Sequence, residues 1–330
     1  MRSYELGVGL AGSLLPEDYR AIATSVESAG FDAITVFGDL MFQPPALVLH
    51  TMAAATSRIR LGVAAFSPWL QHPVEIAGQI AYLDRMSNGR AFYGLVRGAW
   101  LDRLGIDQSR SLAAIRDTVE IVGRLLREDG EGYQGEVYSI EARTTLMYDV
   151  LRPSVPLLIG TWSPRLARYA AEVADELQAG GSANPAMVAE LRARAGLSAD
   201  AETKICLNAV AVVDDDRAAA VTAARTAAAL YFEVIARFDP TIQLEPELLD
   251  RIRSLLAAGD PAAAGALIPS DVLRKFAFAG TAADVAEQAA EIIDAGAWRV
   301  EFDTPFGLDT AAGLRQLTSE VLPRTRALLH

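Results

Sequence analysis

Short apolar segments alternate along the chain with longer segments whose apolar residues recur at helical spacing. Short apolar runs bounded by turn residues are typical of buried parallel strands, and helical spacing indicates helices packed on a sheet. The expected strands are residues 6–11, 33–37, 59–66, 91–95, 155–160, 174–178, 204–213 and 299–303. The expected helices are residues 16–29, 45–56, 73–86, 110–128, 164–175 and 282–295. About eight such repeats predict an α/β fold in which a parallel sheet closes into a (β/α)8 TIM barrel.

Two segments interrupt the alternation. Residues 133–150 resemble a hairpin or loop in which Gly135–Tyr138 is expected to form an edge strand, and residues 217–278 resemble a long helical excursion. Because no change of composition marks a second domain, residues 1–330 are predicted to form a single barrel domain with these two insertions. A doubly wound open sheet is the rival fold. It is disfavoured because the first expected strand is not followed by G-x-G-x-x-G.

The segment Val155-Pro-Leu-Leu-Ile-Gly160 joins a short strand to a helix through Thr161-Trp-Ser163. Ser163 followed by Pro164 is a typical N-cap and first helical residue. Backbone N–H groups and the positive end of the helix dipole meet at such a turn and favour an anion, usually phosphate. An ordinary capped helix gives the same pattern, so this motif alone leaves both interpretations open.

Composition and charge narrow the classes of partner. With 51% hydrophobic and 22% charged residues, the chain is typical of soluble globular proteins. A net charge of −12 argues against nucleic acid and anionic membrane as partners. Cys206 and three dispersed histidines offer no zinc ligand set, so no metal is expected. No uninterrupted apolar run reaches the ~18 residues of a membrane span, and no signal-peptide pattern is visible, so a cytoplasmic location is expected.

The expected carboxyl ends of the strands, where barrel enzymes carry their chemistry, are poor in titratable groups. Asp39, Arg97 and Asp303 are the main ionisable residues there, and no Ser-His-Asp set or carboxylate pair is apparent. Such a site fits chemistry supplied by a bound cofactor. A buried or half-buried Arg97 is expected to meet a carboxylate or phosphate of cofactor or substrate, or else to pair with Asp39, Asp102 or Asp303.

The whole chain resembles the luciferase-like flavin and deazaflavin oxidoreductases, and within them the branch of coenzyme F420-dependent methylenetetrahydromethanopterin reductases. The segment Leu83-Asp-Arg-Met-Ser-Asn-Gly-Arg90 is the most specific for the superfamily, and no segment fixes the substrate. The matching segments are residues 29–33, 53–62, 67–68, 72–73, 80–91, 94–98, 155–160, 174–175 and 280–285.

The resemblance implies that a deazaflavin or flavin binds at the carboxyl end of the barrel. A bulge with a non-prolyl cis peptide ends the third strand in this family, and it corresponds to Ala64 and Ala65, with Phe66 adjacent. Small residues there allow close approach to a planar ring, although tight barrel packing would also select them.

The family's phosphate-binding turn corresponds to Gly160, Thr161, Trp162 and Ser163, in agreement with the anion site expected from the helix start. Trp162 replaces a smaller polar residue, where it could cap the cofactor tail or fill a gap between helices. The resemblance also places Arg97-Gly98 in a glycine-rich turn and makes both residues expected cofactor contacts.

Two departures bear on the substrate. The glutamate that the reductase branch carries near the end of strand one is Gly9 here, and its Asp-His pair after strand two is Gly38-Asp39. A methylene-pterin substrate is therefore not expected. Asp39 is the expected catalytic residue and a cofactor contact, as a hydrogen-bonding group or an acid, although a turn or N-cap aspartate fits the position equally.

These observations predict a coenzyme F420-dependent oxidoreductase. It would transfer hydride between the deazaflavin C5 and an electron-poor C=C, C=N or carbonyl carbon of a small organic substrate. The alternatives are an FMN-dependent luciferase-like monooxygenase and a non-catalytic homologue that binds the cofactor. A homodimer is expected by analogy, with the alanine-rich helices and residues 133–150 as candidate interface.

Overall fold

The structure, a computed structural model, describes residues 4–39, 41–245 and 247–330. The chain divides into two compact units. The N-terminal unit comprises Leu10–Thr161 and Val173–Glu176, and the C-terminal unit comprises Met1–Gly9, Trp162–Glu172 and Leu177–His330. The single-domain organisation with two insertions stays a prediction.

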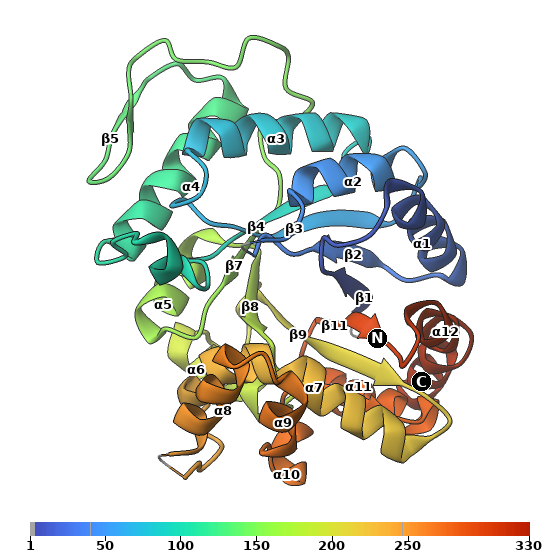
Figure 1. Ribbon diagram of the computed structural model, residues 1–330. Helices are drawn as coiled ribbons and strands as arrows, with labels where there is room; N and C mark the ends of the chain where they lie inside the picture. The colour runs from blue at the N-terminus through green and yellow to red at the C-terminus, as the bar shows by residue number, and fades with distance from the viewer. Residues whose placement is uncertain (1–3, 40, 246) are drawn as a thin grey trace. The chain divides into compact units, whose positions relative to one another are not determined.

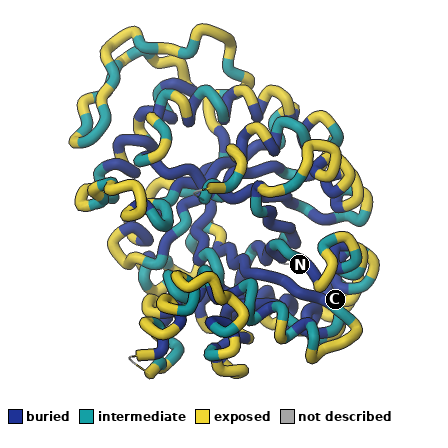
Figure 2. The backbone as a smooth tube through the Cα atoms, viewed as in Figure 1, coloured by how far each residue is buried: buried dark blue, intermediate teal, exposed yellow. Residues whose placement is uncertain are grey.

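The N-terminal unit is built from parallel strands that alternate with helices (Figure 1). Its strands pair in the order β2 (Ala33–Val36), β3 (Arg60–Phe66), β4 (Ala91–Leu95) and β7 (Leu157–Gly160). Its helices are α1 (Pro16–Ala29), α2 (Pro45–Ala53), α3 (Pro73–Met86), the 3₁₀ turn η1 (Leu101–Leu104) and α4 (Ser111–Arg127). The strands are almost wholly buried, whereas the helices expose their outer faces (Figure 2). This is the burial that the sequence pattern predicts for a sheet covered by helices.

The motif that is most specific in the sequence forms a corner between α3 and β4. Asp84 is 1% exposed and accepts two hydrogen bonds from Arg152, at 2.9 and 2.7 Å. Arg90 donates to the carbonyl oxygens of Ile59 at 2.6 Å and Thr56 at 3.0 Å, which closes the loop that enters β3. These residues lie at the amino ends of the strands, where barrel residues serve stability. The motif therefore holds the scaffold at this corner.

The insertion at residues 133–150 begins with an antiparallel hairpin of β5 (Tyr133–Gln134) and β6 (Ser139–Ile140). The prediction of an edge strand over Gly135–Tyr138 is wrong, because this segment is the turn of the hairpin. The Asp117 carboxylate of α4 accepts hydrogen bonds from the backbone N–H groups of Val137 at 2.6 Å and Tyr138 at 3.0 Å. This buried carboxylate holds the turn, and local strand propensity gives no sign of it.

The C-terminal unit carries the remaining parallel strands. β1 (Glu5–Leu10), β11 (Arg299–Phe306), β9 (Lys204–Val213) and β10 (Ala277–Gly280) pair in that order, and β8 (Glu176–Gly180) also pairs with β9. The helices that follow strands are α5 (Pro164–Val173), α6 (Ala186–Ala195), α11 (Ala282–Asp294) and α12 (Thr310–Gln316), which continues through the π turn η3 (Leu317–Val321) into α13 (Leu322–Leu328). Sequence patterning missed β10, α6 and the helices α12 and α13 that follow β11. β10 has only four residues and lies within the segment assigned to the helical excursion.

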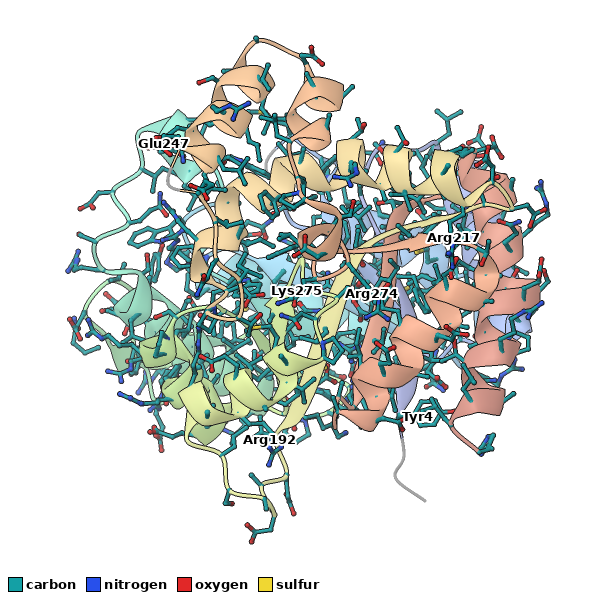
Figure 3. The ribbon with its side chains drawn as sticks, turned by 90° about the horizontal axis from the view of Figure 1, so that it is seen from below. Tyr4, Arg192, Arg217, Glu247, Arg274 and Lys275 are labelled. Carbon is teal, nitrogen blue, oxygen red and sulfur yellow. The ribbon has the colours of Figure 1, made fainter. Side chains whose placement is uncertain are left out.

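The excursion contains α7 (Arg217–Ile235), the 3₁₀ turn η2 (Ala236–Phe238), α8 (Leu248–Ala257), α9 (Pro261–Ala266) and α10 (Ser270–Leu273). By length and composition alone, the segment Arg217–Phe238 could cross a membrane. Its alanines instead pack into the core of the unit, beside Phe232 and residues of α8 and α9. Arg217 forms an ion pair with Asp284 of α11, and Lys275 donates to the Thr241 carbonyl oxygen at 2.8 Å (Figure 3). α7 therefore packs on its unit along one face, which carries Ala220, Ala224, Ala228, Ala229 and Phe232.

Candidate functional site

The carboxyl end of β3 is bulged. Its register with β4 shifts between Val63 and Phe66, and the intervening Ala64–Ala65 peptide bond is cis, the geometry that the family resemblance implies. Ala64 is half-buried, whereas Ala65 and Phe66 are 6% and 2% exposed. Ala64 is thus the most open residue of the bulge. The Phe66 side chain belongs to the core, and its carbonyl oxygen accepts a hydrogen bond from Val96 at 3.0 Å.

Glycines on both flanking strands make room for this bulge. A Cβ atom at Gly38, just beyond β2, would lie 2.0 Å from the Ala65 carbonyl oxygen. A Cβ atom at Gly94 of β4 would lie 2.8 Å from the Ala65 side chain and 2.9 Å from the Val63 carbonyl oxygen. Real Cβ atoms do not approach backbone atoms this closely. The two glycines are therefore required by the backbone path of β3.

Asp39 follows Gly38 directly and lies on the same rim as the bulge. It is half-buried, and its carbonyl oxygen accepts a hydrogen bond from Phe42 at 3.4 Å, which begins a turn. A carboxyl group on this rim can accept hydrogen bonds when ionised or donate a proton when neutral. Its expected catalytic role stays a prediction.

The turn after β4 contains Arg97 and Gly98 and is held by Ser67. The Ser67 hydroxyl donates to the Arg97 carbonyl oxygen at 2.6 Å, and a Cβ atom at Gly98 would lie 3.0 Å from this hydroxyl. Gly98 has φ of 103°, which favours glycine. The expectation of a buried or half-buried Arg97 is wrong. The side chain is exposed, and among the described residues its guanidinium forms no ion pair, with Asp102 or any other carboxylate.

The expected anion-binding turn connects β7 to α5. α5 begins at Pro164 as predicted, and Ala167 N–H donates to the Ser163 carbonyl oxygen at 2.9 Å in its first turn. Thr161 is 8% exposed, Trp162 is half-buried and Ser163 is exposed. The turn therefore presents the start of a ten-residue helix, with its N–H groups and dipole, beside hydroxyl side chains.

Trp162 is fixed at its indole N–H and at its carbonyl oxygen. Its indole N–H donates to the Gly180 carbonyl oxygen at 3.1 Å, and its own carbonyl oxygen accepts from Arg194 Nη1 at 2.7 Å. The same guanidinium donates from Nη2 to the Phe238 carbonyl oxygen at 3.0 Å and from Nε to Glu190 at 2.6 Å. Arg194 thus joins the turn to η2, the 3₁₀ turn that follows α7. Sequence reasoning missed Arg194, because nothing in a helical arginine indicates which carbonyl groups it will reach.

Asp303 lies within β11, directly before the shift in its register with β9, and is 5% exposed. The Asn208 side-chain N–H of β9 donates to its carboxylate at 2.7 Å. Asn208 was also missed, although it is the one polar residue within the apolar run 205–213. Within residues 4–39, 41–245 and 247–330, no three His, Cys, Asp or Glu side chains cluster as metal ligands would.

Comparisons with known proteins agree with this geometry. A family model described as luciferase-like monooxygenase matches residues 7–299. The 5,10-methylenetetrahydromethanopterin reductase of Archaeoglobus fulgidus is 26% identical over 316 residues, covering 91% of this chain and 93% of the relative. The F420-dependent glucose-6-phosphate dehydrogenase of Kineococcus radiotolerans is 24% identical, covering 96% of this chain and 95% of the relative.

The solved structure of the coenzyme F420-dependent tetrahydromethanopterin reductase from Methanopyrus kandleri has a TM-score of 0.86 and 22% identity, covering 98% of this chain and 99% of that chain. This likeness confirms the predicted (β/α)8 barrel. Strand order, the bulge after Val63 and the family match over most of the chain lead to one conclusion. The chain belongs to the luciferase-like monooxygenase family.

Proposed function

We propose that this protein is a coenzyme F420-dependent oxidoreductase. It transfers hydride between the deazaflavin C5 and an electron-poor C=C, C=N or carbonyl carbon of a small organic substrate. The observation that carries the proposal is the β3 bulge with its paired glycines, in a chain whose full-length relatives are named as a methylenetetrahydromethanopterin reductase and an F420-dependent dehydrogenase.

The residues of the bulge fit a planar ring. Ala64 presents only a methyl group, and the absence of side chains at Gly38 and Gly94 lets the backbone of Ala65 turn inward between neighbouring strands. A flat surface of small residues allows close packing against an aromatic face and excludes water from it. When bound, the deazaflavin supplies a carbon that gives or accepts a hydride. The role of the protein is to hold the two reacting carbons in line.

The turn from Gly160 to Ser163 fits the phosphate of the cofactor tail. A phosphate at the start of α5 would accept hydrogen bonds from backbone N–H groups and from the Thr161 and Ser163 hydroxyls. The local dipole and donors favour the anion although the whole chain has a net charge of −12. Arg97 is exposed beside Gly98, where its guanidinium can pair with a further anionic group of the cofactor or substrate.

Asp39 is the proposed proton-holding group. Asp39 follows Gly38, and Gly38 lies against the Ala65 carbonyl group of the bulge. The Asp39 carboxyl group therefore belongs to the rim that would face a ring at Ala64. A carboxyl group at this position can hydrogen-bond the ring or give a proton to the reduced substrate. Gly9 and Gly38 stand where the reductase branch carries ionisable residues, so the proposed substrate is not a methylene-pterin.

Titration of the purified protein with coenzyme F420 and with FMN, followed by cofactor fluorescence at moderate and high salt, tests the proposal. Selective binding of F420 is the expected result, and Asp39→Asn should retain binding but slow substrate reduction. Selective binding of FMN would replace the proposal with an oxygen-using monooxygenase. F420 binding without any turnover across alkenes, imines and ketones would identify a non-catalytic homologue, and binding of neither cofactor would overturn the proposal.

A homodimer is also proposed. The exposed apolar side chains of Tyr82 and Met86 on α3 and of Met147 in the insertion, the last 96% exposed, are candidate interface residues within the N-terminal unit. Tyr148 joins the insertion to α3 by donating to the Gly78 carbonyl oxygen at 3.0 Å. Sedimentation of the wild type and of Met147→Glu tests this, with a dimer that the variant weakens as the expected result. The cytoplasmic location stays a prediction.

A further inference from the structure

One face of β11 carries three polar side chains although it is buried there. Arg299, Glu301 and Asp303 alternate along the strand, so their side chains point to the same side, and they are 0%, 0% and 5% exposed. Arg299 donates to Glu301 at 2.6 Å. Asp303 is the last of the three, and the register of β11 against β9 shifts immediately after it. Bulges at strand ends commonly re-aim a side chain beside a functional site.

Asn208 lies on the neighbouring strand β9, opposite Glu301 in the register. Its Nδ2 donates to an Asp303 carboxylate oxygen at 2.7 Å. An ionised carboxylate only accepts hydrogen bonds, so this contact fixes which end of the amide faces Asp303 and turns Oδ1 away from it. Asn208 is 8% exposed, and no described residue donates to its Oδ1.

Gln178 presents the complementary group. A Cβ atom placed on Gly180 would lie 3.6 Å from Asn208 Oδ1, so the Gly180 face of β8 is the face that meets Asn208. Gln178 precedes Gly180 by two residues and shares this face. It is 5% exposed, and its Nε2 has no acceptor among the residues that the structure describes. A buried amide donor and a buried amide acceptor thus lie on one polar face without partners of their own.

Buried polar groups are almost always hydrogen-bonded, and an unpaired one carries the full cost of its lost hydration. Gln178 is the middle residue of β8, and Asn208 Oδ1 lies beside Gly180, the last residue of β8, so the pair faces the carboxyl end of that strand, the end at which barrel enzymes bind ligands. We propose that Gln178 and Asn208 form a binding position for a neutral group that both accepts and donates a hydrogen bond, a hydroxyl or a carboxamide.

The ligand group accepts a hydrogen bond from Gln178 Nε2 and donates one to Asn208 Oδ1. A carboxylate or phosphate is disfavoured, since it would face the Asn208 oxygen close to the Asp303 carboxylate. The position selects neutral, hydroxyl- or amide-bearing substrates over anionic ones. The identification of this ligand as a substrate rests on the proposed function, whereas the binding position itself does not.

The apo-protein gives a test that needs no knowledge of the substrate. Gln178→Met keeps the length and bulk of the side chain and removes the unpaired amide. Gln288→Met is the matched control, because Gln288 is 3% exposed and donates to the carbonyl oxygens of Arg274 at 2.6 Å and Ala277 at 3.1 Å. We expect Gln288→Met to lower Tm by about 4 °C or more, and Gln178→Met to leave Tm unchanged or raise it. A comparable loss of Tm in both variants would overturn the proposal.

Saturation-transfer NMR with acetamide, propan-2-ol and acetate as probes tests the ligand class. Acetamide and propan-2-ol should show transfer with the wild type and lose most of it with Gln178→Met, while acetate shows little with either. Absence of transfer from both neutral probes, or the same transfer in wild type and variant, would mean that the two amides hold water only and would overturn the proposal. Titration with F420 separates this result from the proposed function, because Gln178→Met should bind the cofactor as the wild type does.

Discussion

The Ala65 carbonyl oxygen occupies the space in which a side chain at Gly38 would begin, 2.0 Å from the position of its Cβ atom. The oxygen belongs to the backbone, so it cannot turn aside as a flexible side chain would. Gly38→Ala must therefore displace the end of β2 or the bulge of β3. We expect this variant to lower Tm and to weaken F420 binding by about tenfold or more, which corresponds to roughly 1.4 kcal/mol.

Gly78→Ala is the matched control for this prediction. Gly78 lies within α3 of the same unit, and a Cβ atom there would meet only the Tyr148 hydroxyl, at an ordinary 3.5 Å. Alanine in a helix interior is favoured over glycine by roughly 0.5–1 kcal/mol, so this variant should have an unchanged or higher Tm. Wild-type Tm and F420 affinity in Gly38→Ala would contradict the role assigned to the close approach.

Glu27 makes the stability of the N-terminal unit depend on acid pH. Its carboxylate accepts hydrogen bonds from the backbone N–H groups of Ser57 at 2.9 Å, Arg58 at 2.6 Å and Ile59 at 2.8 Å. Burial by itself raises the pKa of this group, but the hydrogen bonds from Ile59, Arg58 and Ser57 outweigh it and lower the pKa to about 2. The folded state therefore binds the proton less readily than the unfolded chain.

A lowered pKa contributes stability that is complete above the ordinary value of 4.5 and is lost as pH falls toward 2. Glu27→Gln should thus lower Tm at pH 7, and the difference from the wild type should shrink as the pH falls below that value. Thermal melts between neutral and acid pH measure this, with the exposed Glu17→Gln as control. A Tm difference that does not change with pH would show that the charge of Glu27 contributes nothing.

His50 makes the stability of the protein depend on pH in a higher range than Glu27 does. Its ring contacts Tyr82, with centroids 4.9 Å apart, and burial lowers its pKa below the ordinary 6.5. The folded protein therefore binds a proton at His50 less readily than the unfolded chain does, and this costs stability as the pH falls below 6.5. Histidines titrate at about pH 5–8, so Tm is compared between about pH 7.5 and 5. The wild type should lose more Tm over this interval than His50→Gln does. His72→Gln is the control, and equal acid sensitivity of the wild type and His50→Gln would refute the assignment.

The sequence predicted most of the scaffold, because strands such as 91–95 and helices such as Pro16–Ala29 carry strong local signals. The cis bond at Ala64–Ala65 was expected from family resemblance rather than from composition. The backbone path there needs glycine at Gly38 and Gly94, because side chains at these positions would clash with the bulge. This need arises from the packing of neighbouring strands, and no local sequence pattern reveals it.

The remaining features depend on contacts between residues far apart in the chain. Asp117 turns Gly135–Tyr138 into a hairpin turn, and Asp303 orients Asn208 from 95 residues away. For a related reason, the sequence alone could not predict that Arg97 is exposed. A carbonyl group in the turn is held by Ser67, so the backbone rather than the guanidinium anchors this segment.

Arg194 should affect only the part of cofactor affinity that comes from the phosphate group. Its guanidinium holds the Trp162 carbonyl oxygen at 2.7 Å, which keeps this acceptor paired and leaves the N–H groups of the turn to face an anion. Arg194→Ala should weaken F420 binding by about tenfold, which corresponds to roughly 1.4 kcal/mol. Arg194→Lys should restore only part of the lost affinity, because lysine lacks the forked guanidinium that also reaches Phe238.

A deazaflavin that lacks the phosphate tail separates positioning from general damage. Its affinity should be the same for the wild type and Arg194→Ala, since the ring surface at Ala64 is untouched. Arg192→Ala is the matched control, because Arg192 lies on the same helix and donates to the Ser198 carbonyl oxygen rather than to the turn (Figure 3). If Arg194→Ala weakened both ligands equally, the arginine would stabilise the C-terminal unit without preparing a phosphate site.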